Sequence, residues 1–452
     1  MGSLAAGEDG GSQLSNGKRD HIHMFTWYRE ADRKTRRIFW TCSAGWAMDM
    51  ADQLVFQYMI PLLIVAFGMT LSEAGFISSA NYFSAAIGGW IGGWLCDRFG
   101  RARMLQFTIL WFSVFSFASG FAQTYDQLLA IRILQGLGFG AEWAVGAVLL
   151  GEVISPGHRG KAVGTVHSGA AIGSGIAALL AGPVAAAFAP DIGWRVVFWS
   201  GILPALLIFL VRRDSDDSEI FRKAAQRSAE QGRKHGVGGI FTPRVLRVTM
   251  LASLLSLGVQ GAAYSISNYL TSFLTIERGL SISVAGVLVL LNSAGGFFGF
   301  LSNAYSSDWL GRRNVFRVFG AGFVLTSLFY LYAPLGSSVP LLAIAGFVYG
   351  FFQFGMYASF GAYFTELFPT ELRGNGQAFA YNSGRAGSAV FIMLVPLVAT
   401  ATTLSGAMAL LGCSGIALVV IATMLLPETA GRELHGLDEL EKPASSRAAP
   451  VG

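Results

Sequence analysis

The sequence predicts an all-α membrane protein with twelve transmembrane helices in two pseudo-symmetric six-helix bundles. Apolar residues make up 53% of the chain and charged residues only 13%. The apolar residues fall in runs of about twenty, which is the length that crosses a bilayer as a helix. A charged connector separates the first six runs from the last six, and short motifs recur in both halves.

The chain divides into five segments. We expect a cytoplasmic tail with a basic surface helix at 1–37, a six-helix bundle at 38–212, a cytoplasmic connector at 213–244, a second bundle at 245–427 and a cytoplasmic tail at 428–452. The predicted spans are 38–67, 72–96, 104–122, 126–150, 160–186, 193–212, 245–275, 281–305, 315–333, 339–366, 374–398 and 403–426.

The positive charges indicate the orientation. All but four of the 32 Lys and Arg residues fall in segments that share one side of the membrane, the exceptions being Arg132, Arg195, Arg278 and Arg385. Cytoplasmic loops carry such an excess, so both termini are expected in the cytoplasm and the chain in a cell membrane, the bacterial inner membrane. Charges spread between spans in this way do not indicate a nucleic-acid partner.

Two internal repeats support the division into halves. "GGWLCDRFGRARM" (92–104) follows the second span and "NAYSSDWLGRRNV" (303–315) follows the eighth, so that Asp97 aligns with Asp308. "GEVISPGHRGKA" (151–162) likewise matches "TELFPTELRGNG" (365–376). Corresponding motifs after corresponding spans are typical of transporters built from structural repeats.

These motifs resemble those of the major facilitator superfamily over almost the whole chain. The D-R-x-G-R motif at 97–101, "RILQGLGFG" in the fourth span and "PETAGREL" after the twelfth carry the resemblance. "GWAMDMADQLVFQYMIP", "GAEWAVGAVLLGE" and "YNSGRAG" are more narrowly similar to proton-coupled metabolite and organic-acid symporters, the sialate- and lactate-transporter-like branch. "DQLVFQ" stands where aromatic residues are usual in that branch, which indicates a different substrate. The resemblance implies the major facilitator fold and transport by alternating access.

A gating role is predicted for the charged residues of the repeats. Charges at span ends can bridge the two bundles in one conformation and release them in the other, although they could also simply orient the chain. Glu152 and Glu366 are candidate anionic partners for the arginines. The candidate gating residues are Asp97, Arg98, Arg101, Glu152, Arg159, Asp308, Arg312, Glu366 and Arg373.

Proton coupling is predicted for two carboxylates in the first span. At 1.5 Å per residue, Asp49 lies about 16 Å and Asp52 about 21 Å from the inner face, and Arg132 in the fourth span also lies about 21 Å from it. A buried Arg opposite two Asp residues can keep one ionised, while like-charge repulsion favours protonation of the other. We expect Asp49 to titrate because it lies further from Arg132. The alternative is an inert ion pair, and Glu142 is either a second proton carrier or a structural partner.

The predicted substrate site centres on Arg385, about 16 Å deep in the eleventh span. A guanidinium facing the cavity can bind a carboxylate with two hydrogen bonds, unless backbone carbonyls or Asp49 satisfy it. His167 could titrate near neutrality or be a hydrogen-bonded structural residue. Other polar residues that could orient a ligand are Asn382, Tyr264, Asn268, Gln353 and Tyr357.

The function class follows by exclusion. The sequence has no catalytic arrangement, metal cluster or phosphate loop, and its three cysteines show no metal or disulfide spacing. We therefore expect no enzyme and no cofactor. The resemblance, together with Arg385 and the two aspartates, implies a monomer that carries a small organic acid with protons across the bilayer, using the proton gradient. The alternatives are a proton-linked carrier of a cationic drug or amine, in which the aspartates bind the cation, and a carrier of a neutral, sugar-like solute.

The orientation is testable by labelling. In a variant without its native cysteines, Glu230→Cys should resist a membrane-impermeant maleimide added to intact cells, because the connector at 213–244 is expected in the cytoplasm. Labelling should become rapid once the cells are permeabilised. Rapid labelling of intact cells would reverse the predicted orientation.

Overall fold

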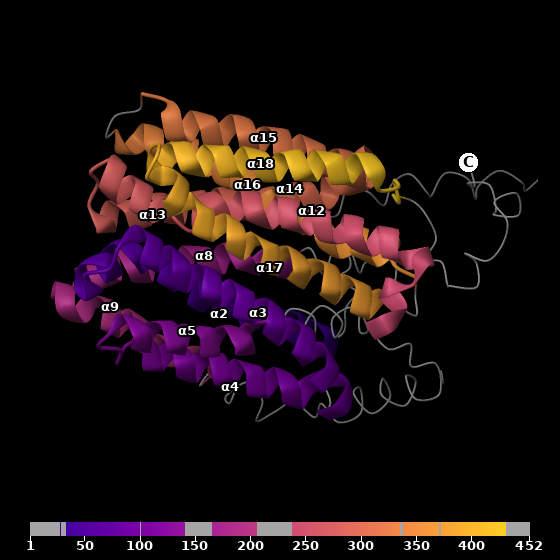
Figure 1. Cartoon of the computed structure of the whole chain (residues 1–452), viewed down its shortest axis with the longest axis horizontal. Helices are drawn as coiled ribbons and strands as arrows, with labels where there is room; N and C mark the ends of the chain where they lie inside the picture. Colours follow the sequence, from indigo (N-terminus) through magenta and orange to yellow (C-terminus); the bar gives the residue numbers. More distant parts are fainter. Residues whose placement is uncertain are drawn as a thin grey trace, which may run out of the picture.

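The computed structural model of the chain describes residue 28 and residues 33–99, 101–140, 165–205, 237–334, 338–369 and 372–430. Regular structure in these residues is helical, and none of them belongs to a strand. The long helices run along the longest axis of the molecule (Figure 1). The first long helix, α2, begins and the last, α18, ends at the same end of the bundle, which we call the termini end.

The described part of the N-terminal half contains six helical runs, some ending in a short π or 3₁₀ turn. They are α2 (Arg33–Phe67), α3 (Leu71–Phe99), α4 (Arg101–Ser119), α5 (Tyr125–Phe139), α8 (Gly169–Leu179) with η3 (Leu180–Val184), and α9 (Pro190–Trp199) with η4 (Ser200–Ile202).

The described part of the C-terminal half begins with the short turn η5 (Val237–Phe241) and also has six runs. They are α12 (Pro243–Ser267) with α13 (Leu270–Ser272) and η6 (Phe273–Glu277), α14 (Ile282–Leu310), α15 (Arg312–Tyr332), α16 (Val339–Leu367), α17 (Arg373–Ala399) and α18 (Leu404–Leu425).

Every predicted span coincides with a helix where the structure describes it. Residues 141–164 and 206–236, which include parts of the fourth, fifth and sixth spans, lie outside the described residues. Eight helices in the described part are long and apolar enough to cross a membrane. Some helices run past the predicted spans, as α14 does by reaching Leu310 instead of 305, because a helix can continue beyond the apolar stretch into a charged motif.

The two halves repeat the same helix crossing. In the N-terminal half, a Cβ on Gly88 of α3 would overlap the carbonyl oxygen of Leu137 on α5. In the C-terminal half, a Cβ on Gly299 of α14 would overlap the carbonyl oxygen of Phe351 on α16. Only glycine allows the backbones to approach this closely, so these pairs locate a shared close contact. The sequence repeat is therefore also a structural repeat.

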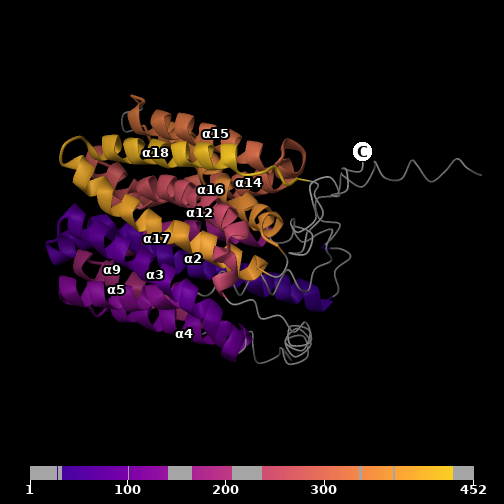
Figure 2. The same ribbon diagram turned by 45° about the vertical axis from the view of Figure 1, so that its right-hand side comes forward.

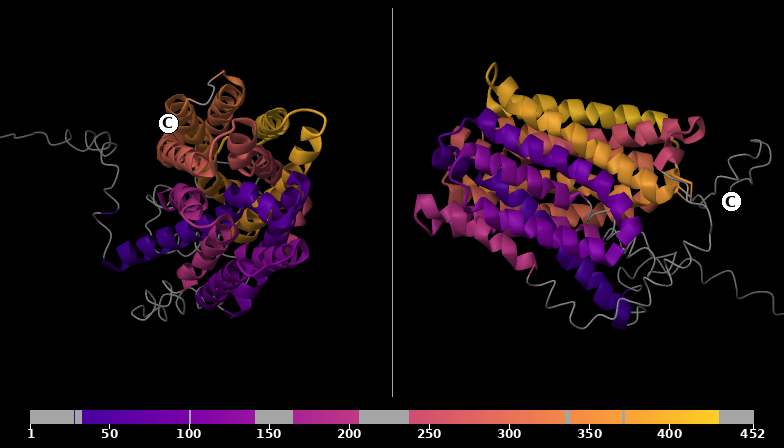
Figure 3. Two further views of the ribbon diagram at one scale, coloured as in Figure 1. Left: turned by 90° about the vertical axis from the view of Figure 1, so that its left-hand side faces the viewer. Right: turned by 60° about the horizontal axis from the view of Figure 1, so that its bottom comes forward.

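The halves meet along two pairs of helices. α3 lies beside α17, and α8 lies beside α14 (Figures 1 and 2). Viewed along the helices, the two halves stand next to each other (Figure 3). The Ser79 hydroxyl donates to the Ala389 carbonyl at 2.7 Å in the first pair, and the hydroxyls of Ser174 and Ser293 are 2.7 Å apart in the second. Few, short polar contacts of this kind hold the halves in register.

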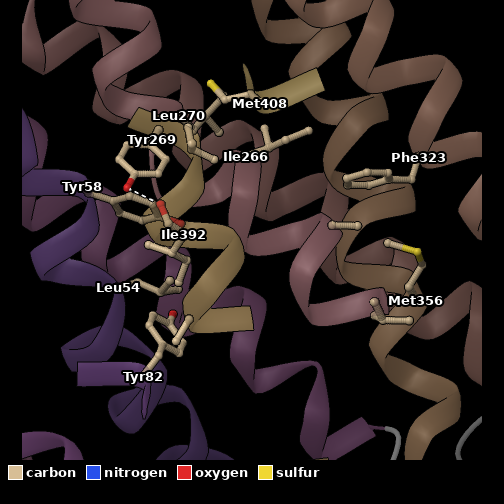
Figure 4. Close-up of a cluster of buried hydrophobic side chains, with 14 of the residues drawn as sticks. Leu54, Tyr58, Tyr82, Ile266, Tyr269, Leu270, Phe323, Met356, Ile392 and Met408 are labelled. Carbon is tan, nitrogen blue, oxygen red and sulfur yellow. Dashed lines mark hydrogen bonds between the residues drawn. The ribbon is translucent and has the colours of Figure 1, made fainter. Parts of the chain in front are cut away.

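Buried apolar side chains fill the interior of both halves. Tyr58 and Tyr82 lie at the boundary with α17, while Phe323 and Met356 lie deeper in the C-terminal half (Figure 4). The Tyr269 hydroxyl donates to the Ile392 carbonyl at 2.7 Å, so this buried tyrosine has a hydrogen-bond partner (Figure 4). At this position, aromatic packing is thus combined with a satisfied polar group.

Two carboxylates, those of Glu366 and Glu428, bind the start of α15 at the termini end of the C-terminal half. Arg312, the first residue of α15, pairs with Glu366 of α16 at 2.9 Å. Gly311 before it has φ +87°, a left-handed conformation that favours glycine. Glu428, beyond α18, accepts the backbone N–H groups that begin α15, at 2.8 Å from Arg312 and 3.0 Å from Arg313. A carboxylate at a helix N-terminus satisfies otherwise unpaired donors.

The hydrogen bonds to Glu428 affect its pKa more than its burial does. Burial by itself raises the pKa of this carboxyl, but the four backbone N–H groups that donate to it lower the pKa below its usual value. A carboxyl whose pKa is lower in the folded protein stabilises that state above its unfolded pKa of about 4.3, and this contribution is lost as the pH falls through the folded pKa.

Glu428→Gln should therefore lower the thermal stability in detergent at pH 7, by about 1 kcal/mol. The difference from the wild type should shrink as the pH falls below about 4.3 and through the lower pKa of the folded carboxyl. The control is Glu73→Gln, because Glu73 is exposed and accepts only from the neighbouring Thr70, so its loss of stability at pH 7 should be smaller. An equal loss of stability at pH 7 and pH 3.5 would contradict the role of the charge.

Candidate functional site

The Asp52 carboxylate is buried inside the N-terminal half, with 6% of the residue exposed. It lies on α2 and accepts hydrogen bonds from the Ser116 hydroxyl of α4 and from the Gln135 side-chain amide of α5. A Cβ on Gly201 of η4 would come within 3.1 Å of one carboxylate oxygen. Three neighbouring elements thus enclose this group, and both donors are uncharged.

Arg132 lies on α5, one turn before Gln135, and is 1% exposed. Its guanidinium donates to the side-chain carbonyl of Gln135 and lies 4.6 Å from the ring centres of both Phe56 and Phe198. Cation–π contacts stabilise a guanidinium that has left water. Gln135 therefore joins Arg132 to Asp52: one end of its amide accepts from the cation and the other donates to the carboxylate.

A second pair of buried charges lies near the boundary between the halves. Asp49 on α2 and Arg385 on α17 are each 1% exposed. Both lie within electrostatic range of the Tyr381 hydroxyl, and the Arg385 guanidinium carbon is 5.3 Å from the centre of the Tyr381 ring. Tyr381 thus senses a buried charge from each half.

A cavity of about 740 Å³, its open mouth included, lies between the two halves. More than half of its lining residues are aromatic, and they come from helices of both halves. The rings of Tyr82 and Tyr264 stand 4.6 Å apart across the boundary. No Asp, Glu, Lys or Arg is among the described residues that line this cavity; its polar lining residues are Gln53, His167, Ser267, Gln353 and the tyrosines.

The predicted ligand residues fall into two groups. Tyr264, Gln353, Tyr357 and His167 line the cavity, while Asn268, Asn382 and Arg385 do not. The Asn382 amide occupies the space that a Cβ on Gly89 would need, so it lies in the crossing of α3 and α17. Arg385 was predicted to face the cavity, but in this structure Tyr381, whose ring lies beside its guanidinium, is the lining residue. A role for Arg385 in binding stays a prediction.

The gating residues are described only in part. Arg312 and Glu366 pair within the C-terminal half, not across the halves, and Arg373 donates to the Thr365 carbonyl at 2.9 Å in the same half. Glu142, Glu152 and Arg159 lie outside the described residues, and so do the side chains of Asp97, Arg98, Arg101 and Asp308. A gating role for these residues stays a prediction.

The sequence analysis did not assign roles to several residues that build this site. Gln135 belongs to the quoted motif "RILQGLGFG", and its position three residues after Arg132 was the available signal, because such residues share a helix face. Gln53 follows Asp52 directly and lines the cavity, which no spacing indicated. Trp46 and Tyr82 are further lining residues without a sequence signal.

Known proteins resemble this chain throughout. The family model of the Major Facilitator Superfamily matches residues 41–392. A probable 4-methylmuconolactone transporter from Cupriavidus pinatubonensis is 39% identical over 428 residues, which cover 95% of this chain and 98% of the relative. The cis,cis-muconate transport protein of Acinetobacter baylyi is 28% identical over 420 residues, covering 92% and 98%. The crystal structure of a D-xylose-proton symporter aligns with a TM-score of 0.72 at 20% identity, covering 88% of this chain and 99% of that one, a likeness of fold alone.

The link between Asp52 and Arg132 is testable by a double-mutant cycle. Asp52→Asn and Arg132→Gln should each lower the melting temperature in detergent, because each leaves a buried charge without its counter-charge. The double variant should recover about 2 kcal/mol relative to the sum of the two. Arg195→Gln is the control, because Arg195 donates to the carbonyls of Gly120 and Ala122, and its effect should add to that of Asp52→Asn. Additive effects of Asp52→Asn and Arg132→Gln would contradict the link.

Proposed function

Because the chain belongs to the major facilitator superfamily, whose members are transporters and not enzymes, we propose that it is a proton-coupled symporter importing a small organic acid anion by alternating access. Family and fold make it a multi-pass membrane transporter. The proposal includes a monomer in the bacterial inner membrane, with both termini in the cytoplasm. The proton gradient drives transport, and no cofactor takes part.

The surroundings of Asp52 carry the proton part of the proposal. A direct ion pair with Arg132 would hold this carboxylate in its charged form, but Ser116 and Gln135 are its hydrogen-bond partners. The Gln135 carbonyl is already occupied by Arg132, but the Ser116 hydroxyl can donate to a carboxylate or accept from a carboxylic acid. The site can therefore satisfy Asp52 with or without its proton. This geometry favours Asp52 as the proton carrier, whereas the sequence favoured Asp49.

The cavity supports a flat, unsaturated or ring-containing substrate. Aromatic side chains from both halves can stack against such a molecule. Two buried polar atoms of lining residues, the indole Nε1 of Trp46 and the amide oxygen of Gln353, have no hydrogen-bond partner in the structure. A bound ligand can supply the missing partners. The relatives named for methylmuconolactone and cis,cis-muconate transport favour a small organic acid.

Arg385 supports an anion despite its position behind Tyr381. Its charge acts on Tyr82, Tyr264 and Tyr381, which all line the cavity. Asp49 acts on Tyr381 alone among these three, so the influence of the cation on the cavity is the broader one and favours a carboxylate there. An amine would instead need an acidic lining residue, and none is among the described ones. A sugar would need more polar lining groups than this aromatic wall offers, so both alternatives are less well supported.

Transport by proteoliposomes tests the proposal. With an inward proton gradient, radiolabelled cis,cis-muconate or benzoate should accumulate, and the accumulation should vanish without the gradient. Choline and D-xylose should not accumulate. Asp52→Asn should abolish accumulation but keep exchange of the acid, because exchange does not require loss of the proton. Asp49→Asn is the matched variant and should keep both. Gradient-independent uptake of the acids, or accumulation of choline or xylose in their place, would refute the proposal; loss of accumulation only in Asp49→Asn would return the proton to Asp49.

A further inference from the structure

A chain of buried hydrogen bonds connects the cavity with the Asp52 cluster. Gln53 lines the cavity, and its amide nitrogen donates to the Asn81 side-chain oxygen on α3 at 2.8 Å. The Asn81 amide nitrogen donates to the backbone carbonyl of Arg132 on α5 at 2.7 Å. Gln53 and Asn81 are each 5% exposed, so water does not compete freely for these bonds. The chain thus ends on the residue that faces Asp52 through Gln135.

These bonds close into a ring because α2 supplies both ends. Successive residues of a helix are rotated by about 100°, so Asp52 points toward α4 and α5 while Gln53 points toward the cavity and α3. The chain runs from Gln53 through Asn81 to Arg132, then through Gln135 back to Asp52. A change at Gln53 therefore reaches Asp52 along its own helix and along the chain.

The contact between α3 and α5 is close enough to transmit such a change. A Cβ on Gly136 would overlap the Ser84 hydroxyl and stand 2.5 Å from the Asn81 carbonyl. Because no side chains separate the two backbones here, a shift of α3 displaces α5 as well. The Asn81 amide therefore fixes the position of Arg132.

The other half contains the same bond without the charges. Asn292 of α14 donates to the carbonyl of Gly346 on α16 at 3.1 Å, and a Cβ on Gly350 would overlap the Asn292 carbonyl. In the sequence repeat, Asn292 corresponds to Asn81, Gly350 to Gly136, and Gly346 to Arg132. Both halves thus use an asparagine to join two helices. In the N-terminal half, the carbonyl that accepts this bond belongs to Arg132, and the asparagine itself accepts from the cavity-lining Gln53.

We propose that Gln53 and Asn81 are positioning residues that couple occupancy of the cavity to protonation of Asp52. A substrate that accepts a hydrogen bond from the Gln53 amide competes with Asn81 for this donor. The hydrogen bond from Asn81 to the Arg132 carbonyl then changes as well. The inference rests on the proposed proton symport. Among the described groups, Arg132 on α5 is the charged group that acts on Asp52, and α2 itself carries Asp49 one turn before it. The neighbouring α4 and η4 contribute Ser116 and Gly201.

The test compares Asn81→Leu with Asn292→Leu, its counterpart in the other half. Binding of cis,cis-muconate to each full-length protein in detergent is measured between pH 5.5 and 8, together with uptake in proteoliposomes. In the wild type, the affinity should fall at least fivefold as Asp52 loses its proton. Asn81→Leu should reduce this dependence to less than twofold and lower the accumulation driven by the gradient. Asn292→Leu should keep the wild-type pH dependence even if it is less stable.

If Asn81→Leu does not fold, a second variant still tests the inference. Gln53→Leu removes only the first bond of the chain, and it should weaken binding and also flatten its pH dependence. Wild-type pH dependence in Asn81→Leu or Gln53→Leu would overturn the inference, as would equal flattening in Asn292→Leu, which would make the bond purely structural. If the wild type itself shows no dependence on protons, the proposed symport fails and the inference fails with it. If the wild type is proton-coupled and Asn81→Leu is unaffected, only the inference fails.

Discussion

Burial of Asp52 and Arg132 inside one helix bundle is the constraint on which much of this molecule depends. Neither charge is more than 6% exposed, so the protein must replace their hydration with its own groups. Gln135 meets both because one amide can donate and accept. Two aromatic rings cover the cation, and Gly201 leaves room beside the carboxylate. The packing of α2, α4, α5 and η4 is therefore organised around this pair.

The two halves use one scaffold for different purposes. The crossing of α3 with α5 and that of α14 with α16 share their glycine contacts and their asparagine-to-carbonyl bond. At the carbonyl the N-terminal half carries Arg132, and the C-terminal half carries Gly346. The described part of the C-terminal half instead pairs its charges at the termini end, where Arg312 contacts Glu366. Duplication thus supplied the geometry, and single side chains made the halves chemically different.

The buried charged residues lie close to the cavity but do not line it. The described lining is aromatic and carries no Asp, Glu, Lys or Arg, yet Asp52 adjoins Gln53 in the chain and Arg385 stands beside Tyr381. An apolar ligand surface can thus contact flat molecules, while buried charges behind it determine the local potential. In the proposed symport, the substrate and the proton would occupy different places and influence each other through the side chains between them.

The sequence by itself determined the class of this protein. Span length, the asymmetry of positive charge and the repeated motifs predicted an all-helical transporter in two halves, and the family match confirms the resemblance drawn from Asp97–Arg101 and "RILQGLGFG". Counting residues also brought Asp52 and Arg132 to one depth, because depth along a helix depends only on its rise. Rotation about the helix axis depends on what packs against it. Only the tertiary structure therefore decided that Gln135 stands between Asp52 and Arg132, that Asn382 points into the α3–α17 crossing, and that Tyr381 lines the cavity where Arg385 was expected.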